Sequence, residues 1–395
     1  MFTASDQRAL GAVAVQFFVN GAIFASFIPR LPEIRDRVDI SVAEVGLLMS
    51  IAGVSGLVGS AVVGPAVSRL GTRRVMLAAG TLTSLSLPVI GIARAPWVLL
   101  VGLIALQTFD VLMDVAMNMQ GSWLSARRHT PVMTRLHGLW SLGTVIGGVS
   151  ASRIAAAGIS VSTHLVCAAT ILLVALGFAS RSLLRVDEHP GSGLTNGAKQ
   201  GSPGKRRASP VLMAFLLVGF FSIALESTAI DWAAFRLTDD FTASTGVAAL
   251  GYVAVASGMT AGRFSGDFIA AQVGGTRLLS MSIILTGVGL AAATLSPDQT
   301  LTLVGYVVTG LGVANLSPIL YDTAAQHPGR PGAGLGALTA GLRTANLTVP
   351  LLVGTLAATR LSVGSAIAFV TLPAVIGFLA VANLISRVRS RAPDP

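Results

Sequence analysis

Charged residues are scarce in this chain. Only 11% of its 395 residues are Asp, Glu, Lys or Arg, whereas 53% are hydrophobic, and the mean hydropathy is +0.76. A soluble globular protein carries roughly 25% charged residues, so this chain has too few of them to cover a surface that faces water. The composition therefore excludes an ordinary soluble domain and indicates a protein embedded in a lipid bilayer.

Cysteine and histidine are also rare. The one cysteine, Cys167, lies in an apolar segment, which excludes a disulfide or a thiolate metal site within the chain. The five histidines are scattered and do not show the spacing of metal ligands. The chain has no phosphate-binding loop of the G-x-x-x-x-G-K-[ST] type. We therefore expect no cofactor, no ATP hydrolysis and no other enzymatic activity.

Long apolar runs, in contrast, fill most of the chain. A helix needs about 20 mostly apolar residues to cross the hydrocarbon core, and a helix satisfies its backbone hydrogen bonds within one segment. The predicted fold class is an all-α membrane protein with twelve transmembrane helices. The expected spans lie near residues 9–28, 43–66, 75–93, 96–119, 132–156, 161–183, 211–234, 244–265, 277–295, 299–321, 333–358 and 363–386.

The basic residues are distributed unevenly between the two sides of the expected bundle. With both termini on one side, 19 of the 27 Lys and Arg fall on that side and seven on the other, and Arg343 falls within a span. Because Lys and Arg accumulate in cytoplasmic loops, we expect both termini in the cytoplasm. The formal net charge of +10 then reflects topology and attraction to anionic lipid, and we expect no nucleic-acid partner.

One long stretch, 186–209, is rich in Gly, Ser, Pro and Lys, which is typical of a flexible linker. It separates an expected N-terminal six-helix bundle, 1–185, from a C-terminal one, 210–395. The motif around Gly71 after the second span returns around Gly274 after the eighth span. This echo predicts a parallel internal repeat, that is, two pseudo-symmetric bundles around a central cavity.

Several short motifs resemble a known transporter family. The stretch from Gly64 to Arg74 resembles the loop signature G-x-x-x-D-R-x-G-x-R-R of the major facilitator superfamily, with Ser68 in place of the usual Asp. Five other stretches resemble the MosC-like branch of bacterial inner-membrane permeases: FFVNGAIFASFIPRLPEIRDR, DVAMNMQGSWLSARR, MTRLHGLWSLG, ESTAIDWAAF and GLGVANLSPIL. The resemblance covers essentially the whole chain. It implies the major facilitator fold, secondary transport of a sugar-like polar solute across the cell inner membrane, and function as a monomer.

Two acids interrupt the seventh span. Glu226 is expected somewhat outside the middle of the membrane and Asp231 nearer the outer interface, beside Trp232. Five residues turn a helix by about 500°, so the two side chains point about 140° apart and cannot form one carboxylate pair. Glu226 is either a proton carrier or substrate ligand facing the cavity, or a structural acid. For Asp231 an outer-gate role is favoured over proton coupling.

The fourth span carries a polar stripe of Gln107, Asp110, Asp114 and Asn118, which fall on one helix face. Asp110 is a candidate for proton or solute chemistry. Asp114 is expected to pair with an arginine of the loop signature and so latch the cytoplasmic side. The candidate cytoplasmic-gate residues are Arg69, Gly71, Arg73, Arg74, Asp114 and His137.

Other polar groups in the spans are candidates for the substrate cavity, because polar side chains in hydrocarbon normally face a cavity or a partner. Arg343 is the only full positive charge that the sequence places in the core, and its expected partner is Glu226, Asp110 or an anionic group of the substrate. For the uncharged candidates the alternative is an interhelical hydrogen bond or simple packing. The cavity candidates are Arg343, Asn346, Asn20, Gln16, Asn315, Trp140 and Tyr252.

These features predict a proton-coupled secondary transporter that moves a small polar solute by alternating access. Proton coupling is expected because the spans hold four acids against one arginine, and a buried carboxylic acid can lower its cost by binding a proton. The alternatives are a drug or metabolite exporter of the same superfamily and a non-transporting receptor. Drug export is disfavoured because Asp110 stands where drug antiporters usually carry an arginine, and the stretch from Gly143 to Gly148 lacks the Pro of G-P-x-x-G-G.

Overall fold

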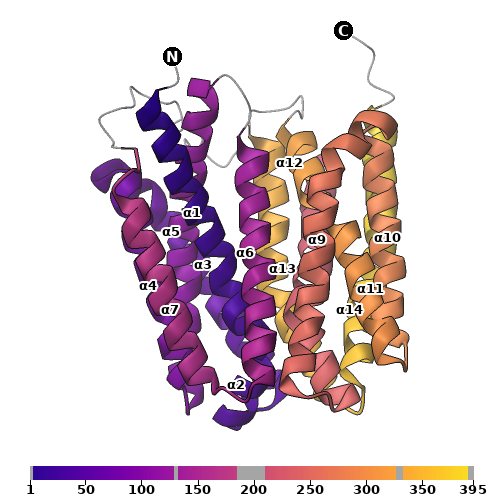
Figure 1. The fold of residues 1–395 in the computed structure, drawn as a ribbon. Coiled ribbons are helices and arrows are strands. Elements are labelled where there is room, and N and C mark those ends of the chain that lie inside the picture. Colours follow the sequence, from indigo (N-terminus) through magenta and orange to yellow (C-terminus); the bar gives the residue numbers. More distant parts are fainter. Residues whose placement is uncertain (1–2, 129–131, 185–209, 326–331, 390–395) are drawn as a thin grey trace.

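The computed structural model describes residues 3–128, 132–184, 210–325 and 332–389, which form an all-helical bundle without β-strands (Figure 1). The first half contains α1 (Ala4–Phe27), the 3-10 turn η1 (Ile28–Arg30), α2 (Leu31–Val38), α3 (Val42–Leu70), α4 (Thr72–Ile92), α5 (Pro96–Arg128), α6 (Met133–Ala156) and α7 (Val161–Ser180). The second half contains α8 (Pro210–Phe235), the π-helical turn η4 (Arg236–Asp240), α9 (Thr245–Val273), α10 (Gly275–Leu295), α11 (Gln299–Val313), α12 (Leu316–Ala325), α13 (Ala333–Ala357) and α14 (Val363–Arg389). The predicted linker at 186–209 lies outside the described residues.

The helices are built for a bilayer. Among the described residues, ten helical segments are long and apolar enough to cross a membrane, and α6 and α13 are two further helices of 24 and 25 residues. Each of the twelve expected spans coincides with one of these segments, although the first continues through η1 into α2 and the tenth is broken between α11 and α12. Large apolar side chains such as Phe178 and Phe369 are 68% and 69% exposed, as expected where lipid covers the surface. The predicted all-α membrane fold is confirmed.

Local sequence explains where several helices begin. The side chains of Thr3 and Ser41 each accept a hydrogen bond from the backbone N–H three residues on, and the carboxylates of Asp6 and Glu44 accept one from the backbone N–H of the cap residue. Both are complete capping boxes, which satisfy backbone donors at a helix start. Gly71 between α3 and α4 has φ 80°, and Gly274 between α9 and α10 has φ 83°. Because side chains disfavour this conformation, the two echoed glycines form the same turn in both halves.

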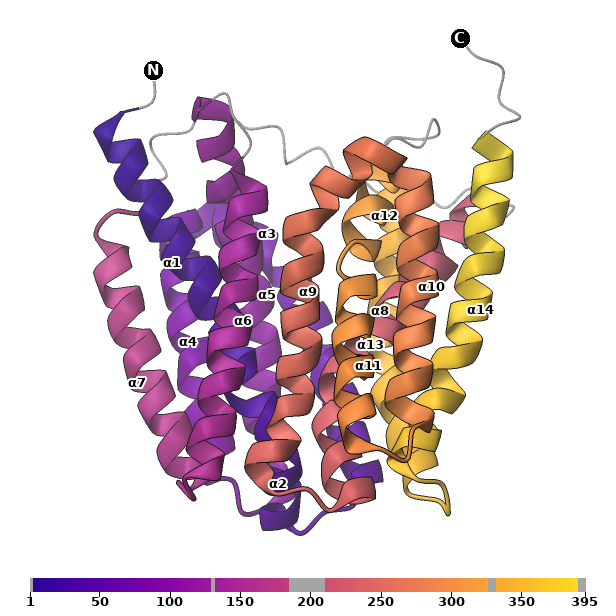
Figure 2. The same ribbon diagram turned by 45° about the vertical axis from the view of Figure 1, so that its right-hand side comes forward.

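The packing of one half repeats in the other. In the first half α1 packs on α6 and α7, and α3 packs on α5; in the second half α8 packs on α13 and α14, and α9 packs on α11. The contacts between the halves also match, because α3 packs on α13 and α6 packs on α9. Figure 2 shows α6 beside α9. This is the arrangement expected of a parallel internal repeat.

The bundle has two distinct ends. Figure 1 shows the start of α1 and the end of α14 at the same end, called here the terminal end, and α2 at the opposite end, called here the α2 end. At the α2 end the halves are tied together. The Arg35 guanidinium lies 2.5 Å from the Asp239 carboxylate and 5.4 Å from the centre of the Phe235 ring. In addition, the Ser152 hydroxyl donates to the Gly246 carbonyl at 2.7 Å.

Close contact between α9 and α11 depends on a pair of glycines, which gives a first prediction. A Cβ on Gly258 would lie 2.1 Å from the Val307 carbonyl oxygen, and one on Gly310 would lie 2.2 Å from that of Val255. Overpacking of this kind costs about 1–3 kcal/mol. We expect Gly258→Ala to lower the melting temperature of the detergent-purified protein by several degrees in a fluorimetric scan. Gly336→Ala is the matched control, because no atom lies within 4 Å of its added Cβ; equal melting temperatures for the two variants would contradict the packing argument.

Candidate functional site

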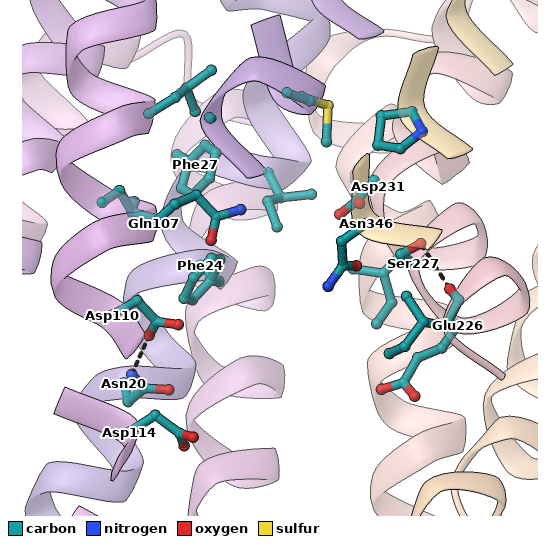
Figure 3. A pocket seen from close by; sticks show the side chains of 18 of the residues that line it. Asn20, Phe24, Phe27, Gln107, Asp110, Asp114, Glu226, Ser227, Asp231 and Asn346 are labelled. Atoms are coloured by element: carbon teal, nitrogen blue, oxygen red, sulfur yellow. Dashed lines mark hydrogen bonds between the residues drawn. The ribbon is translucent and has the colours of Figure 1, made fainter. Parts of the chain in front are cut away.

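A cavity of about 470 Å³ lies between the two halves (Figure 3). Helices α1, α3, α5 and α6 of the first half and α8, α9 and α13 of the second half contribute to its wall. Its polar and charged lining residues are Asn20, Gln107, Asp110, Asp114, His137, Trp140, Glu226, Ser227, Asp231, Tyr252, Arg263 and Asn346. A space lined by both repeats is where the fold would hold a ligand.

The cavity changes character along its length. Towards the α2 end its wall is formed by apolar side chains of α1 and η1, among them Phe24, Phe27 and Ile28. In Figure 3 Phe27 lies towards one end of the view and Asp114 at the other, with Phe24 between Gln107 and Asp110. Most of the polar groups therefore lie between Phe27 and the terminal end.

Asn20 is the centre of a hydrogen-bonded chain in the first half. Its amide nitrogen donates to the Asp110 carboxylate at 2.6 Å, and its amide oxygen accepts from the Trp140 indole nitrogen at 2.8 Å. The side chain is buried, with 4% exposed, so both bonds satisfy groups that would be costly to leave unpaired. Asn20, Asp110 and Trp140 were all predicted site residues, and they come together here.

Arg263 of α9 joins the two halves across the cavity. Its guanidinium donates to the Ser141 hydroxyl of α6 at 2.9 Å and lies 4.9 Å from the centre of the Trp140 ring, within the range of a cation–π contact. The same guanidinium lies 3.7 Å from the Glu226 carboxylate of α8. Arg263 was one of the 19 basic residues that the sequence analysis counted on the side of the termini. Because it lines the cavity, the expectation that Arg343 would be the only positive charge in the core is wrong.

Glu226 faces the cavity and has Arg263, not Arg343, as its cationic partner. The Ser317 hydroxyl of α12 lies 3.5 Å from the Glu226 carboxylate and donates to it, and Ser317 also lies 3.3 Å from the Ser222 hydroxyl. The Glu226 side chain is 16% exposed. At 3.7 Å its ion pair with Arg263 is longer than a good charge-assisted hydrogen bond of about 2.7–2.9 Å, so this carboxylate is held loosely.

Asp231, predicted as an outer-gate residue, lines the same cavity as Glu226 and lies nearer its α2 end. The face of α8 that borders the cavity is broad, because it also includes Ile223, Ser227 and Ile230. It can therefore carry both acids despite the angle between them. Figure 3 shows the two carboxylates on the same wall, opposite Asp110. As predicted, the two acids do not pair directly, since the described residues show no hydrogen bond between them.

The predicted cytoplasmic latch is not formed in this structure. Asp114 lines the cavity and accepts a hydrogen bond from the Asn118 amide at 2.9 Å, whereas Arg73 donates to the Ser180 carbonyl at 2.9 Å. Arg69 and Arg74 are exposed at the ends of α3 and α4. An ion pair of Asp114 with Arg73 or Arg74 was expected, and it is not found among the described residues.

The remaining gate and cavity candidates divide into two groups. His137 lines the cavity, and its ring meets that of Phe17 edge to face at 5.1 Å between centroids. Asn346 and Tyr252 also line it. Arg343, Gln16 and Asn315 are not among its lining residues.

The three predicted residues outside the cavity make their contacts elsewhere in the bundle. Arg343 donates to the Ser60 hydroxyl of α3 at 3.0 Å, so it bridges α13 to the first half, and its charge also acts on the carboxylates of Asp110 and Asp114. Asn315, at the break between α11 and α12, donates weakly to the Gly262 carbonyl at 3.4 Å, which is the interhelical alternative. Gln16 is fully buried, and its amide atoms have no hydrogen-bond partner within the described chain.

Sequence reasoning missed Arg263 and the apolar end of the cavity. A signal for Arg263 was present, because the helical pattern from Thr245 continues for ten residues beyond Arg263 to Val273. For the apolar end, the sequence shows apolar residues at spacings of three and four: Phe24, Phe27 and Leu31, from α1 to α2. Such a stripe is typical of any packed helix. Ser317, which contacts Glu226, had no distinguishing pattern.

Comparison with known proteins agrees with this architecture. A family model for the Major Facilitator Superfamily matches residues 13–338. The membrane protein MosC of Rhizobium meliloti is 28% identical over 314 residues, which cover 80% of this chain and 75% of MosC. An uncharacterized MFS-type transporter of Yersinia pestis is 26% identical over 367 residues, which cover 92% of this chain and 87% of that protein.

Solved structures share the fold at low sequence identity. A variant of the nucleoside transporter NupG has a TM-score of 0.74 and 13% identity, with 96% of this chain and 99% of that chain covered. An inward-facing, occupied bacterial homolog of the human lysosomal transporter Spinster has a TM-score of 0.70 and 15% identity, with 100% of both chains covered. Together with the twelve helical segments and the cavity between two repeated halves, these matches show that the chain belongs to the Major Facilitator Superfamily and is a MosC-like, multi-pass membrane protein.

Proposed function

We propose that this protein is a proton-coupled secondary transporter that moves a small polar solute of the sugar or inositol type by alternating access. In this proposal the half formed by residues 1–185 rocks against the half formed by 210–395, with 186–209 as the linker. The protein acts as a monomer in a bacterial-type inner membrane. The terminal end faces the cytoplasm, because most Lys and Arg residues lie on that side.

The observation that carries the proposal is the set of ionisable groups in the cavity wall. Four carboxylates (Asp110, Asp114, Glu226 and Asp231) face one guanidinium, that of Arg263. Carboxylates can gain and lose a proton, whereas the guanidinium stays charged. An excess of acids inside the membrane is costly unless protons or a ligand balance it, which supports a transport cycle that moves protons.

Neutral polar groups support a hydroxylated solute. Asn20, Gln107 and Asn346 line the cavity from three helices, and Ser227 and Tyr252 add hydroxyl groups. Amides and hydroxyls can both donate and accept hydrogen bonds, as sugar hydroxyls do. The aromatic faces of Trp140 and Tyr252 suit the apolar face of a sugar ring.

Proteoliposomes test the proposal directly. Protein reconstituted with a lumenal pH dye is given radiolabelled myo-inositol or glucosamine under an imposed pH gradient. Proton coupling predicts solute flux that follows the gradient and a lumenal pH change when solute moves without one. Flux that ignores the pH gradient would refute proton coupling, and specific binding without flux would favour the receptor alternative.

The ties at the α2 end give a prediction about alternating access. The Arg35 and Asp239 side chains are 12% and 22% exposed, and their contact has to break before the cavity opens at this end. Because such shielded pairs contribute roughly 1 kcal/mol, we expect Arg35→Ala to raise several-fold the rate at which an externally added, membrane-impermeant maleimide labels a cysteine at Ile230. The assay uses Ile230→Cys in a Cys167→Ser background.

Arg37→Ala is the matched control for this labelling assay. Arg37 also lies on α2, but it contacts the Ser162 hydroxyl and the Ile90 carbonyl of its own half. Its loss should leave the contact between the halves intact. If both variants accelerate labelling equally, the ion pair with Asp239 has no specific role in closing this end.

The apolar end of the cavity favours a second candidate, a drug or metabolite exporter. The wall at this end is an apolar surface that suits a hydrophobic group better than hydroxyl groups. It is formed by Phe24, Phe27, Ile28, Leu31 and Met49. An exporter of this kind would move ethidium out of energised cells, and it would leave myo-inositol flux at background. Inositol flux without ethidium flux would favour the first candidate.

A further inference from the structure

The four acids of the cavity differ in their partners. Asp110 accepts a hydrogen bond from Asn20, Asp114 accepts one from Asn118, and Glu226 lies beside Arg263 and Ser317. Asp231 has no hydrogen bond and no ion pair within the described chain. It is therefore the one cavity acid whose charge the described residues leave uncompensated.

The surroundings of Asp231 do not supply a cation. The charged group that acts most strongly on its carboxylate is that of Glu226, which carries the same sign. The nearest arginine along the chain, Arg236, is held by the Asp240 carboxylate and by backbone carbonyls, including Ser296. Arg263 is occupied by Glu226 and Ser141.

The position of Asp231 suits a ligand. It lies in the cavity wall next to Ile230, closer to the apolar α2 end than Glu226 is. Ser227 lies one helical turn before it on the same face, and Tyr252 and Asn346 line the cavity from α9 and α13 (Figure 3). A carboxylate attracts an ammonium group more strongly in low-dielectric surroundings than in water, and this attraction, together with the neutral acceptors nearby, offsets the cost of removing the charges from water.

We propose that Asp231 is the counter-ion for an ammonium group on the transported solute, so that the substrate class is a small hydroxylated amine. This inference rests on the proposed transport function and assigns its substrate chemistry. The ammonium donates to the Asp231 carboxylate, and its other N–H groups reach the oxygens of Ser227 and Asn346. The hydroxylated body of the solute lies towards Asn20 and Gln107, while Glu226, beside Arg263, remains free to exchange the coupled proton.

Matched probes test this assignment by binding alone. The full chain, purified in detergent, is titrated with glucosamine, which carries an ammonium group, and with glucose and N-acetylglucosamine, which are neutral at the same position. Ethanolamine and ethylene glycol form a second, smaller pair of a charged and a neutral probe. We expect the amines to raise the melting temperature and the neutral partners to leave it unchanged. In Asp231→Asn the apparent affinity for the amine should fall at least about tenfold, because a desolvated charge pair has lost one partner.

Asp39→Asn is the control substitution. It makes the same chemical change at an exposed residue with φ 58°, a conformation that Asn tolerates. Its amine affinity should match that of the wild type, and Asp231→Glu should recover part of the affinity. Equal stabilisation by charged and neutral probes, no stabilisation by either amine, or unchanged amine binding in Asp231→Asn each overturns the inference.

Flux measurements separate the two proposals. Amine binding that depends on Asp231 but is not followed by uptake into proteoliposomes would contradict transport and leave the binding site standing. Proton-coupled flux of myo-inositol, unchanged in Asp231→Asn and not competed by glucosamine, would contradict the binding site and leave transport standing.

Discussion

Glu226→Gln is expected to abolish accumulation of solute against its gradient while leaving solute exchange across the membrane. Glutamine has the shape of the protonated acid but cannot release a proton. If Glu226 carries the coupled proton, the variant can still bind solute and reorient, but a pH gradient no longer drives it. One pH unit is worth about 1.4 kcal/mol, or a concentration ratio of about ten for one proton per solute, and this ratio should fall to about one.

Two assays in the same proteoliposomes check this expectation. Net uptake of a radiolabelled solute under a pH gradient measures accumulation, and exchange of lumenal for external solute without a gradient measures reorientation. Glu44→Gln is the matched control, because Glu44 is an exposed capping residue of α3 and Gln also serves at that position. If Glu226→Gln accumulates solute as well as the control does, Glu226 is a structural acid and the proton is carried elsewhere.

Much of the fold could be predicted because the bilayer imposes simple rules on a sequence. A span must be helical and mostly apolar, so hydropathy located all twelve helical segments. The echo of Gly71 in Gly274 also indicated the repeat, since both occupy a turn that favours glycine. The continuation of the first span into α2 and the break at Ala314 were not predicted, because neither interrupts the apolar pattern in a way that hydropathy reveals.

The site was harder to predict than the fold, as Arg263 illustrates. A hydropathy pattern cannot distinguish an arginine that faces a cavity from one that faces the cytoplasm, because both interrupt an apolar run. The contact of Arg263 with Ser141 joins residues 122 positions apart in sequence. The same limit explains Arg343, whose charge was interpreted as a sign of an acidic partner, although its contact is the Ser60 hydroxyl on the opposite half.

Helical geometry also gave a partial answer for α8. The angle of about 140° between Glu226 and Asp231 was correctly taken to prevent a direct pair, but it did not reveal that both side chains border the same cavity. Two side chains at this angle can both border a space when the space is as wide as the helix. Only the positions of α1, α9 and α13 around α8 establish that width.

Arg263→Gln is expected to stop transport and to destabilise the protein, and Glu226→Gln in the same chain is expected to restore part of the stability. Loss of the guanidinium leaves Glu226 without a cation and removes the bond to Ser141 and the contact with Trp140. Neutralising Glu226 as well removes the uncompensated charge, although not the lost bond. The coupling free energy between the two substitutions should be about 1 kcal/mol or more.

A double-substitution cycle with Arg343→Gln makes this test specific. Arg343 is also a membrane-embedded arginine that bridges the halves, but its contact is Ser60 and not Glu226. The effects of Arg343→Gln and Glu226→Gln on the melting temperature should therefore add, whereas those of Arg263→Gln and Glu226→Gln should not. Equal additivity in both cycles would mean that the separation of 3.7 Å between Arg263 and Glu226 contributes nothing to stability. In that case the main role of Arg263 would be to connect the two halves through its contacts with Ser141 and Trp140. Arg263→Gln would then lose transport because this connection is missing, and not because Glu226 lacks a counter-ion.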